Sequence, residues 1–458
     1  MSNVNVSLCE WEALRPEHGS ILAGRNLEND ANRELAEHLA DAKCVEILEL
    51  ARGLEIRATS FVGRLSLGEL TITIQPKLSG APFLNLLRYA YGLRHLSVYQ
   101  RLDYDSEKWT FQDLLIQQLA AEVAELLARG IHRDYERLQA QLAVPRGRIA
   151  FDRLAGDPHR SSAVLPCVHY PRTEDTLLNQ VTLAGLVHAA RLTTNVDLRA
   201  HLSRLVKSLT ETVSLRKLNQ ILLSDAKLIL DRRTRAYRST LVLIELLLGN
   251  EGVSLEGETE RVRLPGFLFD MNRFFQALLS RFLHDHLEGV EVQDEHRLNE
   301  LFYYDSDRNP RKRRAPVQKP DFVIRRSQQV EAILDAKYRD LWEKPLPREM
   351  LYQLALYALG QSTGERSATI LYPTLASEAT EQAILLREPS TGAPQAQVIL
   401  RPVNLLKLEM LLRDEGWKSN TKRMALAHQL SFGTGQMPLL WSSTTMSRIE
   451  TVLREYPK

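Results

Sequence analysis

Two carboxylates and one lysine stand at the ends of two short apolar runs in residues 318–341, QKPDFVIRRSQQVEAILDAKYRDL. Asp321 begins the first run, and Asp335 and Lys337 end the second. Charged groups are costly to bury unless they are paired or bind a metal. The pattern therefore indicates a site with a chemical role.

The spacing of these residues predicts that they meet. Thirteen residues separate Asp321 from Asp335, which is enough for two adjacent antiparallel strands joined by the polar turn RRSQQ. Asp335 and Lys337 are two positions apart, so their side chains point to the same face of a strand. We expect the two carboxylates and the ammonium group to converge at one edge of a small sheet.

Oxygen ligands without histidine or cysteine suit Mg²⁺ or Mn²⁺, which keeps several waters and binds a substrate phosphate. We expect Asp321 and Asp335 to be the ligands, together with the main-chain carbonyl of Ala336. Such a metal polarises a phosphate ester and lowers the pKa of an attacking water. Lys337 could orient that water, take part in its deprotonation, or stabilise the developing negative charge.

A basic cluster surrounds the first carboxylate. Residues 309–326 contain seven Lys or Arg residues against the single acid Asp321. Four of the seven are consecutive, namely Arg311, Lys312, Arg313 and Arg314. A charge run of this kind is commonly a solvated loop. Its position beside the carboxylates also fits a phosphate-binding surface.

A following helix carries a further polar pair. In PREMLYQLALYALG, Gln353 and Tyr357 are four residues apart and therefore share one face of a helix. Either they support the carboxylate site, or they belong to an ordinary helix in which the tyrosine is packed and the glutamine is exposed.

These residues resemble the PD-(D/E)xK nuclease signature, here PD at Pro320 and Asp321 followed by DAK at Asp335 to Lys337. Gln353 and Tyr357 resemble the additional motif of the RecB-like branch of that superfamily, where it supports the active site and the nucleic acid. The resemblance implies a restriction-endonuclease-like α/β domain that hydrolyses DNA phosphodiesters with Mg²⁺.

A longer resemblance covers most of the chain. Between about residues 60 and 373 the sequence is similar to the McrC family, the nuclease subunits of McrBC modification-dependent restriction systems. The similar segments, in the order of that family, are FVGRLSLGELTITIQPKL, FLNLLRYAYGLR, VPRGRIAF, LPCVHYPRTEDTLLNQVTLAGL and FLFDMNRFFQALLSRFL.

The McrC resemblance implies a separate partner, a McrB-like AAA+ GTPase hexamer, which supplies motor activity and recognises modified cytosine in double-stranded DNA. In that family the N-terminal region contacts the partner and stimulates its hydrolysis. This chain contains no G-x-x-x-x-G-K-[ST] phosphate loop, so we expect it to bind no nucleotide in the P-loop manner.

One position departs from the McrC pattern. Gln276 stands where the family usually has glutamate, on the helix from which an acidic residue often completes the metal site. Glutamine offers a neutral oxygen and adds no negative charge. Three alternatives stay open: Gln276 acts indirectly, another acid such as Asp285 or Glu300 substitutes, or the metal is bound more weakly. A plain surface or packing role for Gln276 is also open.

Hydrophobic periodicity predicts a mixed α/β fold. A chain of 458 residues is too long for a single hydrophobic core, so we expect more than one domain. The N-terminal strands have expected turns at Gly63 and Gly68, and the C-terminal third has strand-like segments LFYYD, DFVIR, AILDAKY and SATILYP. We expect a strand-rich partner-binding region at 1–108, a mainly helical region at 109–255, a PD-(D/E)xK nuclease domain at 256–415 and a tail of unknown role at 416–458.

Composition excludes several classes of protein. The chain is 44% hydrophobic and 25% charged with mean hydropathy -0.25, and no apolar run approaches the roughly 18 residues of a membrane helix. The N-terminus lacks a signal-peptide pattern, and three separated cysteines give neither a zinc site nor a disulfide framework. We therefore expect a cytoplasmic protein without a membrane partner.

The sequence as a whole predicts a Mg²⁺-dependent DNA endonuclease subunit that a partner GTPase activates. Two alternatives remain. One is a non-catalytic adaptor that activates an NTPase and whose nuclease site is degenerate at Gln276. The other is a stand-alone RecB-like repair nuclease.

Overall fold

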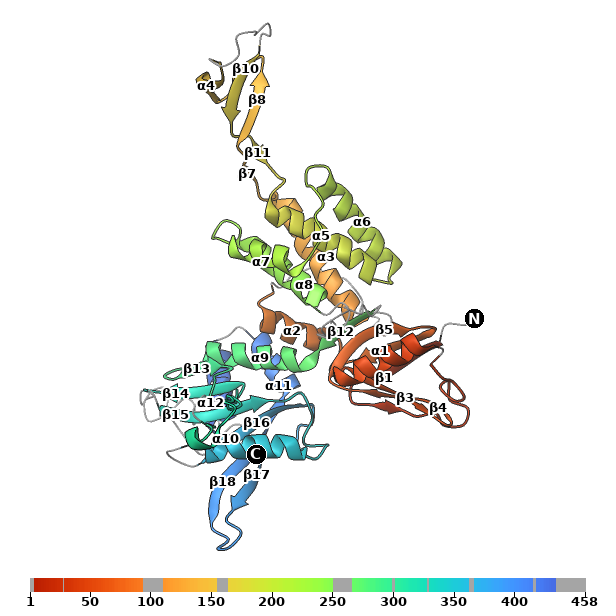
Figure 1. The fold of residues 1–458 in the computed structure, drawn as a ribbon, viewed down its shortest axis with the longest axis vertical. Helices are drawn as coiled ribbons and strands as arrows, with labels where there is room; N and C mark the ends of the chain where they lie inside the picture. The colour runs from red at the N-terminus through yellow and green to blue at the C-terminus, as the bar shows by residue number, and fades with distance from the viewer. Residues whose placement is uncertain are drawn as a thin grey trace.

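The structure is a computed structural model that describes residues 4–27, 29–93, 110–154, 164–249, 266–298, 301–327, 329–361, 366–414 and 417–433. Within these residues the chain has the mixed α/β architecture that its periodicity predicts. Figure 1 shows a β-rich N-terminal part, a group of helices that carries a narrow extension, and a C-terminal part built on a large sheet.

The N-terminal part contains two sheets and helix α1 (Asp30–Asp41). The first sheet has the order β1-β6-β5-β12 and consists of β1 (Val4–Cys9), β6 (Leu70–Gln75), β5 (Phe61–Leu67) and β12 (Gly266–Asp270). The second has the order β2-β4-β3 and consists of β2 (Ala13–Leu14), β4 (Gly53–Ala58) and β3 (Val45–Leu50). The alternation of Leu70, Ile72 and Ile74, all buried, accounts for the predicted β5–β6 hairpin.

Gly63 lies inside β5 and not at the turn that the sequence suggested. It pairs with Ile74 of β6 and with Leu268 of β12. Its φ is +139°, and a Cβ added there would lie 2.1 Å from the carbonyl oxygen of Phe267. The close approach of β12 therefore requires glycine at this position. Gly68 does occupy the β5–β6 turn, as predicted.

The middle part consists mainly of helices. They are α2 (Gly80–Tyr91), α3 (Phe111–Arg129), α5 (Leu177–Leu192), α6 (Val196–Thr210), α7 (Gln220–Leu228), η2 (Arg235–Tyr237) and α8 (Arg238–Gly249). A capping box between Thr110 and Asp113 begins α3 and satisfies N–H groups of its first turn.

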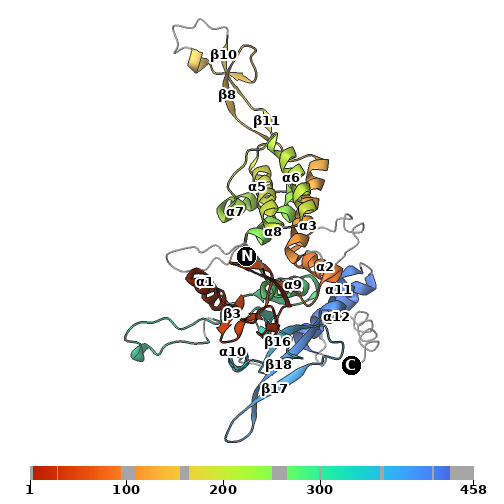
Figure 2. The same ribbon diagram turned by 90° about the vertical axis from the view of Figure 1, so that its right-hand side faces the viewer.

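A narrow stalk, residues 134–154 and 164–173, projects beyond these helices (Figures 1 and 2). It consists of β7 (Asp134–Tyr135), β8 (Leu138–Leu142), β9 (Arg148–Ile149), α4 (Phe151–Leu154), β10 (Leu165–His169) and β11 (Arg172–Thr173). Its strands pair in the orders β8-β10-β9 and β11-β7. The periodicity did not predict this stalk, because β8 is largely exposed along its length and therefore shows no apolar alternation.

The C-terminal part is a mixed sheet in the order β13-β14-β15-β16-β18-β17. Its strands are β13 (Glu291–Asp294), β14 (Phe322–Arg326), β15 (Gln329–Ala336), β16 (Ser367–Thr374), β18 (Pro394–Asn404) and β17 (Gln382–Arg387). β14 and β15 are antiparallel, whereas β15, β16 and β18 run parallel. The helices are α9 (Met271–His286), α10 (Arg348–Leu359), α11 (Leu405–Arg413) and α12 (Trp417–Phe432).

Residues 301–305, LFYYD, do not form the strand that their composition suggested. They lie in a loop that leads to η3 (Ser306–Arg308), and Tyr303 is 86% exposed. The strand that pairs with the outer edge of β14 is β13. A short apolar run forms a strand only where a sheet edge is available to it, and β13 already occupies this edge.

An aromatic cluster joins the three parts. The ring of Phe83 on α2 lies 5.2 Å from those of Phe111 on α3 and Phe274 on α9. Phe269 of β12 lies 4.8 Å from Phe111. Because β12 leads directly into α9, this cluster fixes the beginning of α9 against the N-terminal sheet and the helices.

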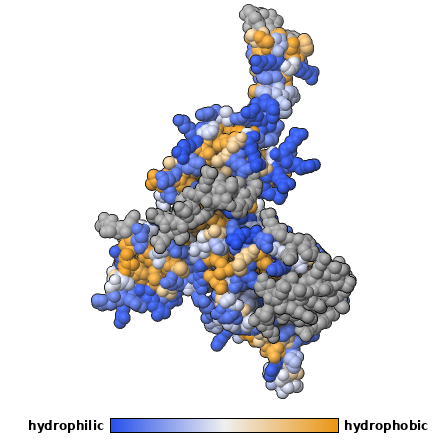
Figure 3. Space-filling view, turned by 180° about the vertical axis from the view of Figure 1, so that it is seen from behind, coloured by the Kyte–Doolittle hydropathy of each residue, from blue (hydrophilic) through white to orange (hydrophobic). Residues whose placement is uncertain are grey.

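The exposed surface mixes polar and apolar residues. On the face seen in Figure 3, hydrophobic residues form separate patches bordered by hydrophilic ones. Across the described residues, no helix combines the length and apolar character needed to cross a membrane.

Replacing Gly63 with alanine is expected to destabilise the chain by about 2 kcal/mol, because the added methyl group meets the Phe267 carbonyl at a left-handed φ. Thermal unfolding of the purified chain measures the effect. Gly249→Ala, at the end of α8 with no atom within 4 Å of the added Cβ, is the matched control and should leave the midpoint nearly unchanged. Equal midpoints for Gly63→Ala and wild type would contradict the role given to the close approach of β12.

Candidate active site

Strand pairing brings the two aspartates face to face. Asp321 immediately precedes β14, and Asp335 lies one residue before the end of β15. Phe322 is opposite Leu334 in the antiparallel β14–β15 pair. The residue before Phe322 and the residue after Leu334 therefore lie across from each other at the same end of the pair.

Lys337 lies beside both carboxylates. Its Nζ is 3.0 Å from Oδ2 of Asp335 and 4.0 Å from Oδ2 of Asp321. Asp335 is only 2% exposed, whereas the side chain of Lys337 is 27% exposed. The structure thus brings together the two acids and the lysine that the sequence analysis singled out, and the side chains of Lys337 and Asp321 are both partly exposed to solvent.

Asp321 has two further hydrogen-bond donors. Its Oδ2 accepts from the main-chain N–H of Ala336 at 2.7 Å, and its Oδ1 accepts from Nε2 of Gln276 at 3.1 Å. Ala336 therefore contributes its main-chain N–H to the site, and its predicted role through the main-chain carbonyl stays a prediction. Gln276, on the inner side of α9, lies in the site and is not a plain surface residue.

The charges in this site are not balanced. Burial, and then the neighbouring Asp335 carboxylate, raise the pKa of Asp321 to about 6. Burial also raises the pKa of Asp335, although Lys337 opposes the shift. Burial acts to lower the pKa of Lys337, but the carboxylates of Asp335 and Asp321 outweigh it and the net shift is upward. Two acids share one ammonium group, so a further cation would stabilise the site.

The donor set fits a hard divalent cation. Asp321 and Asp335 offer carboxylate oxygens, and the described residues contain no cluster of three or more His, Cys, Asp or Glu spaced to hold a metal. Mg²⁺ commonly takes one or two protein carboxylates and completes its shell with waters and substrate phosphate. The arrangement matches that pattern and does not match a closed structural metal site.

Of the two acids that could substitute for the expected glutamate, the structure describes only Asp285. Asp285 accepts a hydrogen bond from the hydroxyl of Tyr89 at 2.8 Å and pairs with Arg281, so its carboxylate is engaged away from Asp321. Glu300 lies outside the described residues.

Glu295 is an acidic neighbour that the sequence analysis missed. Its main-chain N–H donates to the carbonyl oxygen of Asp321 at 2.9 Å, and its carboxylate contributes to the raised pKa of Asp321. Glu295 follows β13, and an assignment of EVQD as the strand before the motif would have placed it beside Asp321. Because LFYYD is predicted as the strand before the motif, the sequence does not indicate that Glu295 lies beside Asp321.

Gln353 and Tyr357 lie on one face of α10 and contact each other. Nε2 of Gln353 donates to the hydroxyl of Tyr357 at 2.7 Å, and Tyr357 is 1% exposed. Burial raises the pKa of Tyr357, and the charges of Asp335 and Lys337 also act on it. The tyrosine is therefore packed, as the ordinary-helix alternative expected, but the glutamine is half-buried and bonded to it beside the carboxylate site.

The four consecutive basic residues lie on an exposed loop that leads to Asp321. Arg311, Lys312, Arg313 and Arg314 are all exposed. The carbonyl and N–H of Arg313 bond to the side chain of Asn309, which orders the main chain of the loop and leaves the guanidinium group outside that contact. Figure 2 shows the loop with η3 extending well away from the large sheet.

Comparisons with known proteins bear on this architecture. A sequence model of the family described as McrBC 5-methylcytosine restriction system component matches residues 56–373. No curated protein matches the chain. Among solved structures, a chain from the refined half-complex of a tetradecameric assembly of Thermococcus gammatolerans McrB AAA+ hexamers with bound McrC has a TM-score of 0.61 at 18% identity, covering 92% of this chain and 98% of that one.

A chain of the Thermococcus gammatolerans McrBC complex seen by cryo-electron microscopy is 20% identical, with a TM-score of 0.46, over 62% of this chain and 88% of that one. At such identities structural likeness establishes the fold alone. The family match spans well over half of the chain, and it includes strands β5, β6 and β12 of the first N-terminal sheet and the carboxylate site. The chain therefore belongs to the McrBC 5-methylcytosine restriction system component family.

Proposed function

We propose that this chain is the DNA endonuclease subunit of a McrBC-type restriction system and hydrolyses phosphodiesters with Mg²⁺ or Mn²⁺. The observation that carries the proposal is the proximity of Lys337 to two carboxylates, the buried Asp335 and the half-buried Asp321, at the end of the β14–β15 pair. Asp321 and Asp335 would hold the cation, with the main-chain carbonyl of Ala336 as a further oxygen ligand. Bound there, the cation would polarise the scissile phosphate and lower the pKa of an attacking water.

Lys337 acts as a cation in this proposal. The net upward shift of its pKa keeps the ammonium group protonated, so it is a hydrogen-bond donor and a poor base. Its Nζ can orient the attacking water or stabilise the negative charge that develops on the phosphate. Of the three roles open from the sequence, the electrostatics favour these two over deprotonation of the water.

The surrounding residues have supporting roles. The hydrogen bond from Gln353 fixes the Tyr357 hydroxyl beside the carboxylates, so this pair orders one wall of the site. The exposed loop with Arg311 to Arg314 contributes positive charge along the approach to Asp321. Side chains of this kind bind phosphates without reading sequence.

A McrB-like AAA+ GTPase hexamer is the proposed activating partner. The Thermococcus gammatolerans assembly that this fold matches contains McrB AAA+ hexamers with bound McrC. This chain has no P-loop of its own, so nucleotide hydrolysis is assigned to the partner, and this subunit stimulates it. Recognition of modified cytosine in double-stranded DNA is likewise assigned to the partner.

One observation favours a second candidate function, a non-catalytic adaptor that activates the NTPase. Gln276 occupies the place beside Asp321 where an acidic ligand is expected, and it presents its amide nitrogen to the carboxylate. Cleavage by the reconstituted complex separates the two functions. Cleavage of DNA by the chain without any NTPase would instead support the stand-alone nuclease.

Asp335→Asn and Lys337→Ala are each expected to reduce DNA cleavage by the reconstituted complex at least about a hundredfold, because each removes a charge from the proposed reaction centre. Stimulation of the partner's GTP hydrolysis should be retained in both. The measurement is the initial rate of duplex cleavage with Mg²⁺ and GTP.

Glu291→Gln is the matched control, since Glu291 is exposed on the neighbouring strand β13 and its carboxylate bonds only to Gln293 among the described residues. Its cleavage rate should equal that of wild type. Intact DNA with every variant and with wild type, while GTP hydrolysis is stimulated, would refute the endonuclease and support the adaptor.

Gln276→Glu is expected to bind Mn²⁺ about tenfold more tightly than wild type, because it adds a negative charge beside Asp321. Isothermal titration of the isolated chain with Mn²⁺ measures the affinity, independently of cleavage. Gln276→Ala serves as the control for loss of the amide. An affinity that does not rise in Gln276→Glu would show that position 276 does not face the cation.

Replacing Arg311, Lys312, Arg313 and Arg314 together with glutamine should weaken DNA binding and flatten its salt dependence. The slope of log Kd against log salt falls by about 0.9 for each phosphate that the protein no longer neutralises. Arg232→Gln with Arg233→Gln, an exposed basic pair in the helical part, is the control and should leave the slope unchanged. Equal slopes for the loop variant and wild type would mean that the loop is only a solvated charge run.

A further inference from the structure

A buried glutamate that the proposed reaction does not use connects the N-terminal sheet to the candidate active site. Glu10 directly follows β1 and is 2% exposed. Its Oε1 accepts hydrogen bonds from the main-chain N–H of Lys77 at 2.8 Å and from the hydroxyl of Tyr338 at 2.9 Å. Lys77 follows β6, the parallel neighbour of β1, so the two strand ends jointly present this carboxylate.

Tyr338 is the residue after Lys337, and its surroundings hold it from several sides. Its ring packs against Phe275 of α9 with a centroid distance of 6.0 Å, and the residue is 4% exposed. Its N–H donates to Oδ1 of Asn272 at 3.3 Å. The preceding N–H, that of Lys337, donates to the carbonyl oxygen of Leu371 on β16 at 3.0 Å.

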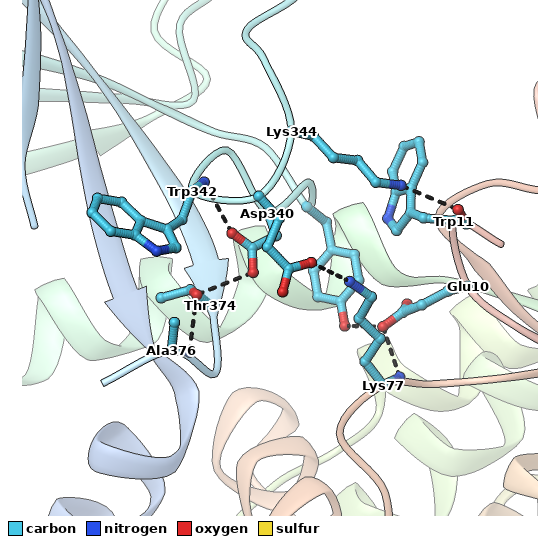
Figure 4. A network of polar contacts seen from close by, with 10 residues as sticks. Glu10, Trp11, Lys77, Asp340, Trp342, Lys344, Thr374 and Ala376 are labelled. Carbon is cyan, nitrogen blue, oxygen red and sulfur yellow. Dashed lines mark hydrogen bonds and ion pairs between the residues drawn. The ribbon is translucent and has the colours of Figure 1, made fainter. Parts of the chain in front are cut away.

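The loop that follows Tyr338 also returns to the N-terminal sheet (Figure 4). Nζ of Lys344 donates to the carbonyl oxygen of Trp11 at 3.1 Å, and it lies 5.4 Å from the centre of the Trp11 ring. The guanidinium group of Arg339 lies 5.5 Å from the same ring. Lys77 pairs with Glu343 at 3.4 Å. The tryptophan is thus contacted by two cations of this loop.

The opposite side of the loop is attached to the large sheet. The carboxylate of Asp340 accepts from the N–H of Trp342 at 3.0 Å and from Oγ1 of Thr374, the last residue of β16, at 3.0 Å. Figure 4 shows the carboxyl groups of Asp340 and Glu10 as hydrogen-bond acceptors in one polar network. The main chain after Lys337 is therefore held between β16 and the end of β1.

Burying a carboxyl group is costly unless it accepts hydrogen bonds. The Tyr338 hydroxyl donates one such bond to Glu10. Burial raises the pKa of Tyr338, so its hydroxyl stays protonated and donates. Among the described residues, Oε2 of Glu10 has no hydrogen-bond partner. The bonds donated by Tyr338 and Lys77 to Oε1 are therefore the hydrogen bonds that this side chain accepts there. Removal of either donor leaves a buried acceptor less satisfied.

We propose that Glu10 is a positioning residue for the candidate nuclease centre: through Tyr338 it fixes the main chain at Lys337, and so the place of the ammonium group between Asp321 and Asp335. The proposal rests on the proposed function of this centre. Only one peptide bond separates the anchored residue from the lysine, so a shift of the Tyr338 main chain displaces Lys337 Nζ from its position 3.0 Å from Asp335.

Tyr338→Phe tests the proposal, because it keeps the packed ring and removes only the donor to Glu10. Tyr372→Phe is the matched control: Tyr372 is buried on the adjacent strand β16, and its hydroxyl has no hydrogen-bond partner among the described residues. Single-turnover cleavage by the reconstituted complex should fall about tenfold for Tyr338→Phe and stay unchanged for Tyr372→Phe. DNA affinity and stimulation of the partner's GTP hydrolysis should be unchanged in both.

A double-variant comparison separates positioning from general destabilisation. In a Lys337→Arg background, Tyr338→Phe should cause less than about a twofold further loss, because the group that it positions is already altered. A full tenfold further loss would mean that Tyr338 acts independently of Lys337 and would overturn the proposal. Glu10→Gln, which keeps an oxygen acceptor, should lose less activity than Tyr338→Phe and serves as the second variant if Tyr338→Phe does not fold.

Crystal structures of the isolated chain test the geometry without cleavage. In Tyr338→Phe, Lys337 Nζ should lie beyond ion-pair distance of Asp335, and in Tyr372→Phe it should keep its ion pair. An unmoved Lys337 in Tyr338→Phe overturns the positioning role. Absence of cleavage by wild type, with Lys337 displaced in the crystal structure of Tyr338→Phe, would refute the proposed function and leave the positioning role supported.

Discussion

The carboxylates of Asp321, half-buried, and Asp335, buried, are held close together with one ammonium group to compensate them. Burial and mutual repulsion both disfavour the doubly ionised state, and the raised pKa values of the two acids express that cost. Lys337, the main-chain N–H of Ala336 and the amide of Gln276 reduce the cost by donating to the carboxylates. A divalent cation would reduce this cost further. The excess of negative charge that destabilises the fold therefore favours the binding of a metal ion.

The groups that meet at the site come from several elements, so the site depends on distant parts of the chain. The β14–β15 pair sets the two acids opposite each other, and α9 supplies Gln276. The beginning of α9 is fixed by β12, which belongs to the N-terminal sheet although it follows the expected boundary at residue 255. The N-terminal sheet also reaches the residue after Lys337 through Glu10. The N-terminal and C-terminal parts in Figure 1 are therefore joined beside the site by direct contacts.

The sequence predicted the local features of the site well and its long-range contacts poorly. Two short apolar runs joined by a polar turn suffice to predict the β14–β15 hairpin, and four-residue spacing suffices to place Gln353 and Tyr357 on one helix face. The hydrogen bond between Glu10 and Tyr338 spans 328 residues, and no local pattern encodes it. LFYYD was misassigned because composition does not reveal which strand occupies the edge of β14. The pairing of Gly63 with β12 was missed for the same reason, since it depends on a distant strand.

The central claim is that Asp321, Asp335 and Lys337 form one cation-binding reaction centre. Anomalous diffraction from crystals of the chain soaked with Mn²⁺ tests it most directly. We predict a single strong peak between the carboxylates of Asp321 and Asp335, within coordination distance of both. A saturated crystal with no peak there, and with both carboxylates still engaged by Lys337, would contradict the claim.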